Sequence, residues 1–183
     1  MDILDDGQLA NGRKAMGSGM PARSSAGGRV KDFADTLRAF EIASENLERI
    51  QQDASFWNDD ADVLRRLDRL ALVNQQAFFV LLFALFEAEL KTHSSALIER
   101  MRNQTEWRDR RAWDLLDDKV RNMQLMQRVA LLTDKGGDIY KRIKELYDIR
   151  NRIAHGTLLT EEIDVAEIAR EIQLFAAGLN EAS

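Results

Sequence analysis

The chain has 183 residues, of which 45% are hydrophobic and 31% charged, a composition that suits one soluble domain with a packed core. It has no cysteine and two histidines, which excludes disulfides, thiolate catalysis and zinc sites of the cysteine or HExxH type. The net charge of −5 excludes nucleic-acid binding through bulk positive charge, so any such contact needs a local basic patch. We expect a cytoplasmic protein that uses no metal and no cofactor.

Residues 1–29 differ in composition from the rest of the chain. They hold six of the ten glycines and the only proline, as in the stretch "MGSGMPARSSAGG". Such a segment buries too little apolar surface to offset the entropy that is lost on ordering. The sequence therefore predicts a flexible tail at 1–29 and one helical domain at 30–183, and Met16 and Met20 leave a downstream start open.

Apolar residues at helical spacing predict long helices in the first half of the domain. The first follows Val30 and ends in "SFWNDD" at 55–60, where Asn58 to Asp60 can cap the next helix. Between Ala61 and Asn103 two alternatives stay open, one very long helix or two helices with a kink near Asn74. The predicted apolar stripes are Phe33, Leu37, Phe40, Leu47 and Ile50; Leu64, Leu67, Ala71, Phe78 and Leu81; and Phe79, Phe83, Phe86, Leu90, Leu97 and Met101.

The run "AFFVLLFALF" at 77–86 is the longest apolar stretch of the chain. Its ten residues are fewer than the roughly 20 that span a bilayer, so it predicts a buried helix and no membrane association. Glu87 and Glu89 follow the run, and the role of Glu87 stays open. His93 is in register with the apolar stripe, which predicts a core histidine with Glu89, four residues earlier, as its partner.

The second half of the domain predicts shorter helices and no strand. "NQTE" at 103–106 has the form of a capping box with Asn103 as N-cap, a further helix runs from about Lys119 to Leu132, and "DKGG" at 134–137 is a loop. Asp117 and Asp118 are interpreted as helix caps. The faces of the last two helices are Ile139, Ile143, Leu146 and Ile153, and then Val165, Ile168, Ile172, Phe175 and Leu179 after a capping box "DVAE" at 164–167. The whole pattern predicts an all-α, up-and-down bundle of about five to seven helices.

The stretch "IRNRIAHG" at 149–156 has two interpretations. In the first it is an ordinary helix end, because cations in the last turn suit the helix dipole and a glycine commonly follows the last helical residue. In the second it is an active site, in which His155 transfers protons and Arg150 binds a phosphate through two parallel hydrogen bonds. Residues five apart lie about 140° apart on a straight helix, so Asn151, four residues before His155, is better placed to orient the imidazole.

Arg150, Asn151 and His155 resemble the signature of the HEPN superfamily, an arginine followed after four to six residues by a histidine at a helix end. The resemblance implies a helical bundle of the HEPN type that forms a homodimer and cleaves RNA without a metal. The expected products are a 2′,3′-cyclic phosphate and a 5′-hydroxyl, with the two histidines of a dimer as base and acid. Toxin–antitoxin and phage-defence systems contain such ribonucleases, which implies a possible antitoxin partner.

Two points of the resemblance stay open. Other HEPN proteins have lost catalysis and bind a protein or a nucleic acid, so a catalytically silent dimeric module is the alternative. One branch of the family carries a tyrosine two residues after the histidine, which a partner antitoxin nucleotidylates. This chain has Thr157 at that position, so that mode of control is in doubt.

Basic residues near the motif are candidates for contact with substrate phosphates. Arg142 and Lys144 make the C-terminal third locally basic, and Arg152 lies within the motif itself, so all three are predicted to bind RNA. The stretch at 100–113 has two interpretations. Its arginines and tryptophans suit a face that contacts RNA, whereas the acidic residues among them suit an ion-paired helix. Its basic and aromatic residues are Arg100, Arg102, Arg108, Arg110 and Arg111, with Trp107 and Trp113.

Overall fold

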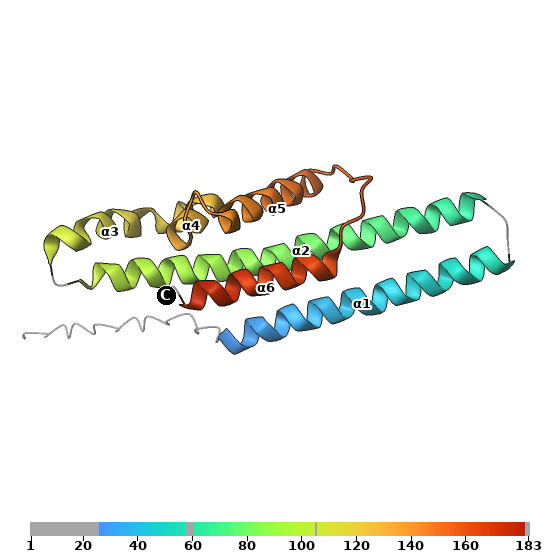
Figure 1. The fold of residues 1–183 in the computed structure, drawn as a ribbon, viewed down its shortest axis with the longest axis horizontal. Coiled ribbons are helices and arrows are strands. Elements are labelled where there is room, and N and C mark those ends of the chain that lie inside the picture. Colours follow the sequence, from blue (N-terminus) through green and yellow to red (C-terminus); the bar gives the residue numbers. More distant parts are fainter. Residues whose placement is uncertain (1–25, 58–60, 105, 182–183) are drawn as a thin grey trace, which may run out of the picture.

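The computed structural model describes residues 26–57, 61–104 and 106–181. These residues form six α-helices and one 3-10 turn, and none of them lies in a strand (Figure 1). The predicted all-α fold is confirmed. The elements are α1 (Ala26–Trp57), α2 (Ala61–Arg102), α3 (Trp107–Lys119), η1 (Val120–Asn122), α4 (Leu125–Leu132), α5 (Asp138–Ala154) and α6 (Val165–Glu181).

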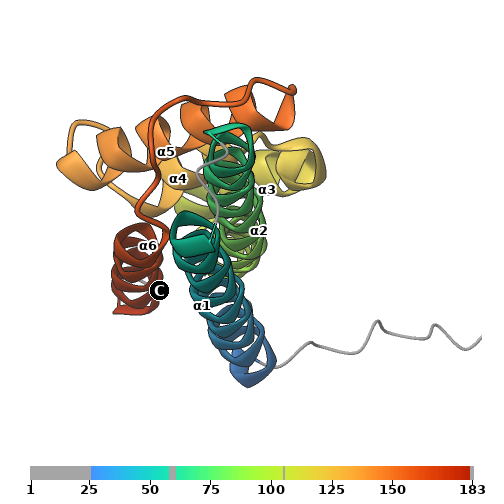
Figure 2. The same ribbon diagram turned by 90° about the vertical axis from the view of Figure 1, so that its right-hand side faces the viewer.

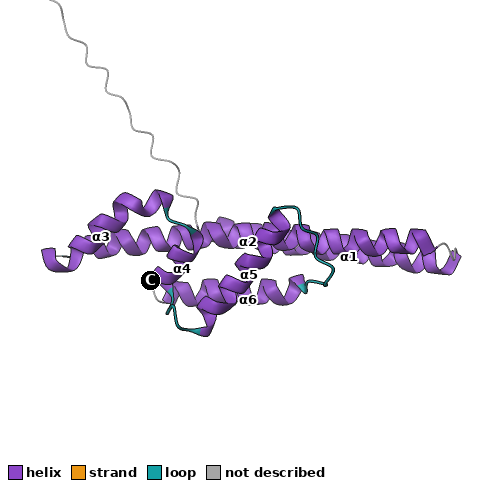
Figure 3. Ribbon diagram, turned by 90° about the horizontal axis from the view of Figure 1, so that it is seen from above, coloured by secondary structure: helices purple, strands orange, loops and turns teal. Residues whose placement is uncertain are grey.

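The two long helices form an antiparallel pair. α1 begins at Ala26, so residues 26–29 are helical, while the rest of the predicted tail and the caps predicted at 58–60 lie outside the described residues. α2 is continuous for 42 residues, about 63 Å, which decides against a kink near Asn74. The second half of α1 and the first half of α2 extend beyond the other helices as a two-helix arm (Figures 1 and 3).

The core lies around the second half of α2. Phe79, Phe83, Phe86 and Leu90 are 0–1% exposed, which confirms this part of the predicted stripe. Side chains of α4, α5 and α6 cover them, and burying each large apolar side chain contributes about 1.5–3 kcal/mol. The residues of those three helices in the core are Val129, Ile143, Leu146, Val165, Ile168, Ala169, Ile172 and Leu179. Figure 2 shows α1, α6 and α5 arranged around α2.

Some predicted core positions are wrong. Ile50 and Leu81 are 50% and 48% exposed, and Ile139, in the first turn of α5, is 48% exposed. At the end of α2, Ile98 is fully buried, while Leu97 and Met101 are half-buried. Periodicity identifies an apolar flank of a helix, but it does not show whether another helix covers that flank. In much of the arm, α1 and α2 have only each other as packing partners.

The start of α3 differs from the predicted capping box. The backbone N–H groups of Asn103 and Gln104 bond back to Arg100 and Met101 and close the end of α2, so Asn103 is not an N-cap. α3 begins four residues later at Trp107, with Glu106 as N-cap and no side-chain cap hydrogen bond.

Asp117 is not a helix cap, because it lies in the last turns of α3 and pairs with the end of α2. Its Oδ2 lies 2.6 Å from Nη1 of Arg102, and Nε of Arg102 donates to Asp114 at 3.1 Å. The hydrogen bond to Asp114 and the charge of Asp117 raise the pKa of Arg102. Asp118, the second predicted cap, is also inside α3.

The helix predicted from Lys119 to Leu132 is broken by a buried arginine. Arg128 is 4% exposed, and its guanidinium donates to Ser94 Oγ at 2.8 Å, to Met123 O at 3.3 Å and to Val120 O. Burial lowers its pKa. The carbonyls of Val120 and Met123 turn toward this charge, so the chain forms η1 and a short extended stretch before α4 begins at Leu125.

The predicted loop and the last helix start are confirmed. In "DKGG" the Asp134 carboxylate accepts from Gly136 N–H at 2.9 Å, and Gly137 N–H bonds to Asp134 O at 2.9 Å. At the start of α6 the Asp164 carboxylate accepts from Glu167 N–H at 2.8 Å.

Among the described residues, α2 is the one helix long and apolar enough to cross a membrane by length and composition. A core helix of a soluble protein meets the same criteria, and α2 packs against α1, α3, α4, α5 and α6.

Candidate active site

The motif at 149–156 forms the C-terminal end of α5. Gly156 has φ +87°, its N–H bonds to Ile153 O at 2.9 Å, and Thr157 N–H bonds to Arg152 O at 3.0 Å. These two hydrogen bonds are the Schellman arrangement, which confirms that the glycine ends the helix. His155 is the C-cap residue, its backbone N–H donates to Asn151 O at 3.0 Å, and it is exposed. This hydrogen-bonded turn therefore presents His155 to solvent.

Arg150 points away from solvent and binds α2. Its Nη2 lies 3.2 Å from Oε2 of Glu87, and both side chains are 26% exposed. Its Nη1 donates to Asn151 Oδ1 at 3.1 Å. Its Nε is buried and has no hydrogen-bond partner among the described residues, an arrangement that costs about 1–3 kcal/mol. The protein thus positions the guanidinium without saturating its donors.

Asn151 orients the arginine. Its side-chain oxygen accepts from Arg150, and in the described part of the chain no hydrogen bond joins its amide to the His155 ring. The helix continues to Ala154, so Arg150 and His155 leave it in different directions, as the predicted angle of about 140° requires. Within one chain, Arg150 therefore lies against α2 and His155 is exposed at the helix end. No hydrogen bond between the two side chains is present among the described residues.

Glu87 is the residue of this site to which the sequence assigned no role. It lies 63 residues before Arg150 and directly after the longest apolar run. The sequence signal for Glu87 is its position, a carboxylate directly after a buried apolar run on the same helix. A half-buried carboxylate in such a place needs a partner. Glu89 has the predicted partner, since its Oε2 lies 3.5 Å from Nε2 of His93.

The loop after His155 is held against α2 by the side-chain amides of two glutamines. Gln76, 1% exposed, donates to Leu159 O at 2.9 Å and accepts from Leu159 N–H at 3.1 Å. Gln75 accepts from Ile163 N–H at 3.2 Å. These bonds place the C-terminal end of α5 beside the middle of α2.

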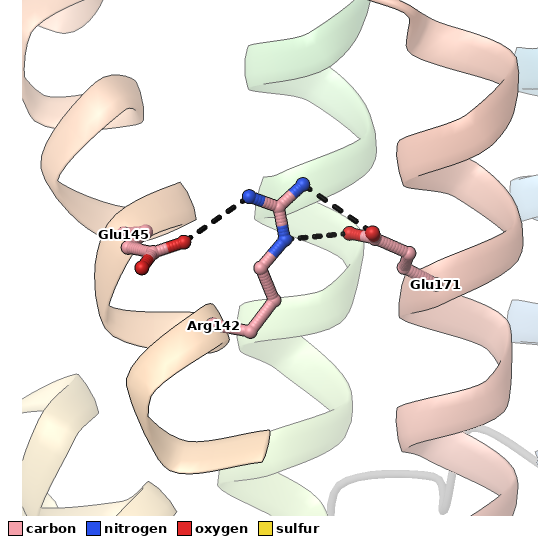
Figure 4. A network of polar contacts seen from close by, with 3 residues as sticks. All are labelled: Arg142, Glu145 and Glu171. Carbon is pink, nitrogen blue, oxygen red and sulfur yellow. Dashed lines mark hydrogen bonds and ion pairs between the residues drawn. The ribbon is translucent and has the colours of Figure 1, made fainter. Parts of the chain in front are cut away.

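The three predicted phosphate-binding residues differ in their surroundings. Arg142 donates to the carboxylate of Glu171 on α6 at 3.0 and 3.3 Å and to Glu145 at 3.2 Å (Figure 4). The hydrogen bond to Glu171 is the main reason that its pKa is raised. Arg142 thus joins α5 to α6, whereas Lys144 and Arg152 are exposed.

The basic, aromatic stretch at 100–113 is ion-paired in part. Arg102 is held by Asp114 and Asp117, and the guanidinium carbon of Arg111 lies 5.3 Å from the ring centroid of Trp107. A cavity of about 410 Å³ lies beside Arg102 and Arg110, and one of about 470 Å³ lies between α1, α2 and the 160–162 segment. Neither of these two cavities is lined by Arg150 or His155. Within the described ranges no group of three or more histidines and carboxylates could hold a metal ion.

No protein-family model, curated protein or solved structure matches this chain. The likeness to HEPN proteins therefore stays a prediction from the motif alone.

Proposed function

We propose that the chain is a metal-independent endoribonuclease of the HEPN type that acts as a homodimer in the cytoplasm. The carrying observation is the exposed His155 at a helix end, five residues after an arginine that contacts Glu87 and Asn151. Histidine is the side chain best suited to proton transfer near neutral pH, and a fixed guanidinium suits a phosphate.

The reaction is a transesterification within the RNA. The 2′-oxygen attacks the adjacent phosphorus, the bond from phosphorus to the 5′-oxygen breaks, and the products are a 2′,3′-cyclic phosphate and a 5′-hydroxyl. One His155 takes the proton of the 2′-hydroxyl, and the His155 of the second subunit gives a proton to the leaving oxygen. Each of these transfers contributes about 10²–10⁴-fold, and Arg150 stabilises the charge that develops on the phosphate.

The remaining residues have supporting roles in this proposal. Asn151 keeps Arg150 in position, and the exposed Lys144 and Arg152 contact phosphates along the strand. A toxin–antitoxin or phage-defence setting, with an antitoxin protein as partner, follows from the resemblance. Thr157 in place of the family's tyrosine argues for control by binding and against nucleotidylation at that position.

A second candidate is a catalytically silent dimeric module that binds a protein or nucleic acid. The observation that favours it is the ion pair of Arg150 with Glu87, which uses the guanidinium to join two helices of the same chain. In that case Arg150 is structural, and substitution of His155 changes no chemistry.

The test is cleavage of RNA by the purified protein in EDTA, with His155→Ala and Arg150→Ala beside the wild type. His93→Gln is the matched control, because His93 is the other histidine and pairs with Glu89 away from the motif. We expect cleavage with cyclic-phosphate ends in the wild type and in H93Q, and loss of at least about 100-fold in the other two. Circular dichroism and solution mass establish that each variant is folded and unchanged in assembly.

Two outcomes contradict the proposal. If H155A cleaves as fast as the wild type, the assigned histidine is wrong. If no RNA is cut by any protein while all are folded, the silent module is the better description.

A further inference from the structure

Tyr147 on α5 has a ring that is fixed by packing and a hydroxyl that the chain leaves without a partner. The side chain is half-buried and packs against the core. Its ring stacks on Phe83 of α2, with the ring centroids 6.3 Å apart and an angle of 27° between the planes. Phe83 is itself fully buried, so the stacking holds the phenol ring in one orientation against α2.

The hydroxyl of Tyr147 forms no hydrogen bond within the described part of the chain. Its oxygen is also not enclosed, because Nε of Arg150 is the one buried side-chain polar atom without a partner among these residues. A tyrosine hydroxyl can donate one hydrogen bond, and it usually has a partner where the ring is packed. The fixed ring of Tyr147 therefore presents an unpaired donor to solvent.

Tyr147 lies one helical turn before Arg150 and Asn151. Around the helix axis it is about 60° from the first and about 40° from the second, so it lies between them. Nη1 of Arg150 donates to Asn151 Oδ1 at 3.1 Å, which places the guanidinium on this same side of α5. Long side chains on a helix also lean toward its N-terminal end. The guanidinium therefore leans over the turn that carries Tyr147.

The contacts with α2 place the phenol ring and the guanidinium next to each other. Phe83 and Glu87 are one turn apart on α2, as Tyr147 and Arg150 are on α5. The stacked rings and the ion pair, in which Nη2 and Oε2 are 3.2 Å apart, are therefore successive contacts between the same two helices. Side chains three residues apart on a helix have Cβ atoms about 5–6 Å apart, so one small group can contact both of them.

Several hydrogen-bond donors in this region have no acceptor. A guanidinium has five N–H groups. In Arg150 each terminal nitrogen donates once, to Asn151 or to Glu87, and Nε is buried. The second N–H of each terminal nitrogen stays unpaired among the described residues, and the hydroxyl of Tyr147 lies beside them. An anion with two accessible oxygens can accept from all of these donors, and a phosphate diester has two non-bridging oxygens.

We infer that Tyr147 binds the substrate, and that its hydroxyl donates to a non-bridging oxygen of the phosphate that Arg150 contacts. That this phosphate belongs to RNA rests on the proposed function. Negative charge on the non-bridging oxygens increases as the 2′-oxygen attacks the phosphorus, so this hydrogen bond is strongest in the transition state. The hydroxyl keeps its proton, and both proton transfers stay with the two copies of His155.

The first experiment compares Tyr147→Phe with Tyr140→Phe in the RNA cleavage assay. Phenylalanine keeps the ring on Phe83 and removes the oxygen alone. Tyr140 is the matched control, because it is the other tyrosine of the chain, lies on α5 two turns earlier and is also half-buried. Y147F is expected to lower kcat/KM by about 10- to 100-fold, the range for a hydrogen bond to a charged group, and Y140F to leave it unchanged. Equal Tm values by circular dichroism establish that both variants keep the wild-type packing.

The second experiment replaces one non-bridging oxygen of the cleaved phosphate by sulfur, in each of the two diastereomers. Sulfur is a weak hydrogen-bond acceptor. The wild type is expected to cleave one diastereomer more slowly than the other, and this ratio is expected to decrease in Y147F, because the hydroxyl that distinguishes them is gone. A tyrosine that only packs against Phe83 does not change the ratio.

The third experiment measures RNA affinity without cleavage, by fluorescence anisotropy of a labelled RNA with His155→Ala protein. Adding Tyr147→Phe to this variant is expected to raise Kd by about threefold or more, since a hydrogen bond to the phosphate is lost. Adding Tyr140→Phe is expected to leave Kd unchanged.

The outcomes separate this inference from the proposed function. Cleavage by Y147F at the wild-type rate, or an equal loss in Y140F, overturns the inference, and the proposed function still stands if H155A is inactive. If the wild type cuts no RNA, the proposed function fails and the affinities decide about Tyr147. A higher Kd with Tyr147→Phe then supports the phosphate contact, whereas an unchanged Kd, or no measurable RNA binding, overturns it.

Discussion

Nη2 of Arg150 on α5 lies 3.2 Å from Oε2 of Glu87 on α2, although the two residues are 63 positions apart in the chain. This pair fixes the arginine of the motif against the longest helix of the fold. Because the carboxylate and the guanidinium are both partly exposed, the pair contributes about 1 kcal/mol at most to stability. Its larger effect is on the position of the guanidinium.

Glu87→Ala is expected to lower the RNA cleavage rate more than it lowers stability. Without its carboxylate partner Arg150 samples other rotamers, so kcat falls by about tenfold while KM changes less. Glu87→Gln keeps an acceptor at the same place and is expected to restore most of the loss. Steady-state kinetics on a short RNA measure both constants.

Glu89→Ala is the matched control, because Glu89 lies two residues after Glu87 on the same helix and its Oε2 lies 3.5 Å from Nε2 of His93. It is expected to leave kcat unchanged. An equal decrease of kcat in both alanine variants contradicts a positioning role for Glu87.

Gly156→Ala is expected to destabilise the fold. The residue has φ +87°, and no atom lies within 4 Å of an added Cβ, so the cost is that of the left-handed backbone alone, about 1–2 kcal/mol. For a chain of this length that lowers Tm by roughly 2–8 °C. Thermal unfolding followed by circular dichroism measures it.

Gly178→Ala tests the same substitution inside helix α6, where an added Cβ also has open space. Here alanine is expected to raise stability by about 0.5–1 kcal/mol, because it has the higher helix propensity. The same sign for both substitutions contradicts the assigned role of Gly156.

Arg142 and Lys144 are expected to separate into a structural and an RNA-binding residue. Arg142→Ala breaks the bonds from α5 to Glu171 and lowers the free energy of unfolding by about 1 kcal/mol or less, since the side chain is 38% exposed. Lys144 is exposed, so Lys144→Ala leaves stability unchanged and reduces the salt dependence of RNA binding by about 0.7 in slope.

Binding titrations at several salt concentrations measure this slope for both variants. A slope that decreases for Arg142→Ala and stays constant for Lys144→Ala shows that Arg142 leaves Glu171 for the RNA.

Gln76→Leu is expected to be the most destabilising of these substitutions. The amide makes two hydrogen bonds to the backbone of Leu159, and its loss leaves a partly buried N–H and a partly buried carbonyl without this partner, at about 1–3 kcal/mol for each group. Chemical denaturation measures the free energy of unfolding. Gln173→Leu, at an exposed position of α6, is the control and is expected to change stability by less than about 0.5 kcal/mol.

Hydrogen exchange at the amides of 157–163 checks the mechanism behind that loss. Exchange in this loop is expected to increase in Gln76→Leu, since the amide no longer holds the loop against α2. An unchanged exchange rate shows that Gln76 stabilises the core and does not position the loop after His155.

The sequence by itself determined the features that depend on residues within one or two helical turns. Helical spacing marked α1, α2, α5 and α6, and the last two end or begin where Gly156 and Asp164 indicated. The pair of Arg150 and His155 was visible for the same reason, because a motif at a helix end is local. Predictions from short motifs were wrong where another contact took the same backbone group. The N–H of Asn103 closes the end of α2, and the carbonyl of Val120 turns to the buried Arg128.

Only the tertiary structure decided which distant residues complete the site. Glu87 meets Arg150 across 63 residues, Gln76 meets Leu159 across 83, and Arg142 meets Glu171 across 29. Side-chain type and local spacing do not predict these contacts, because the packing of apolar faces decides which helices become neighbours. The same packing left Leu70, Val73 and Leu81 of α2 exposed, which periodicity could not show, since an apolar face has the same spacing whether or not another helix covers it.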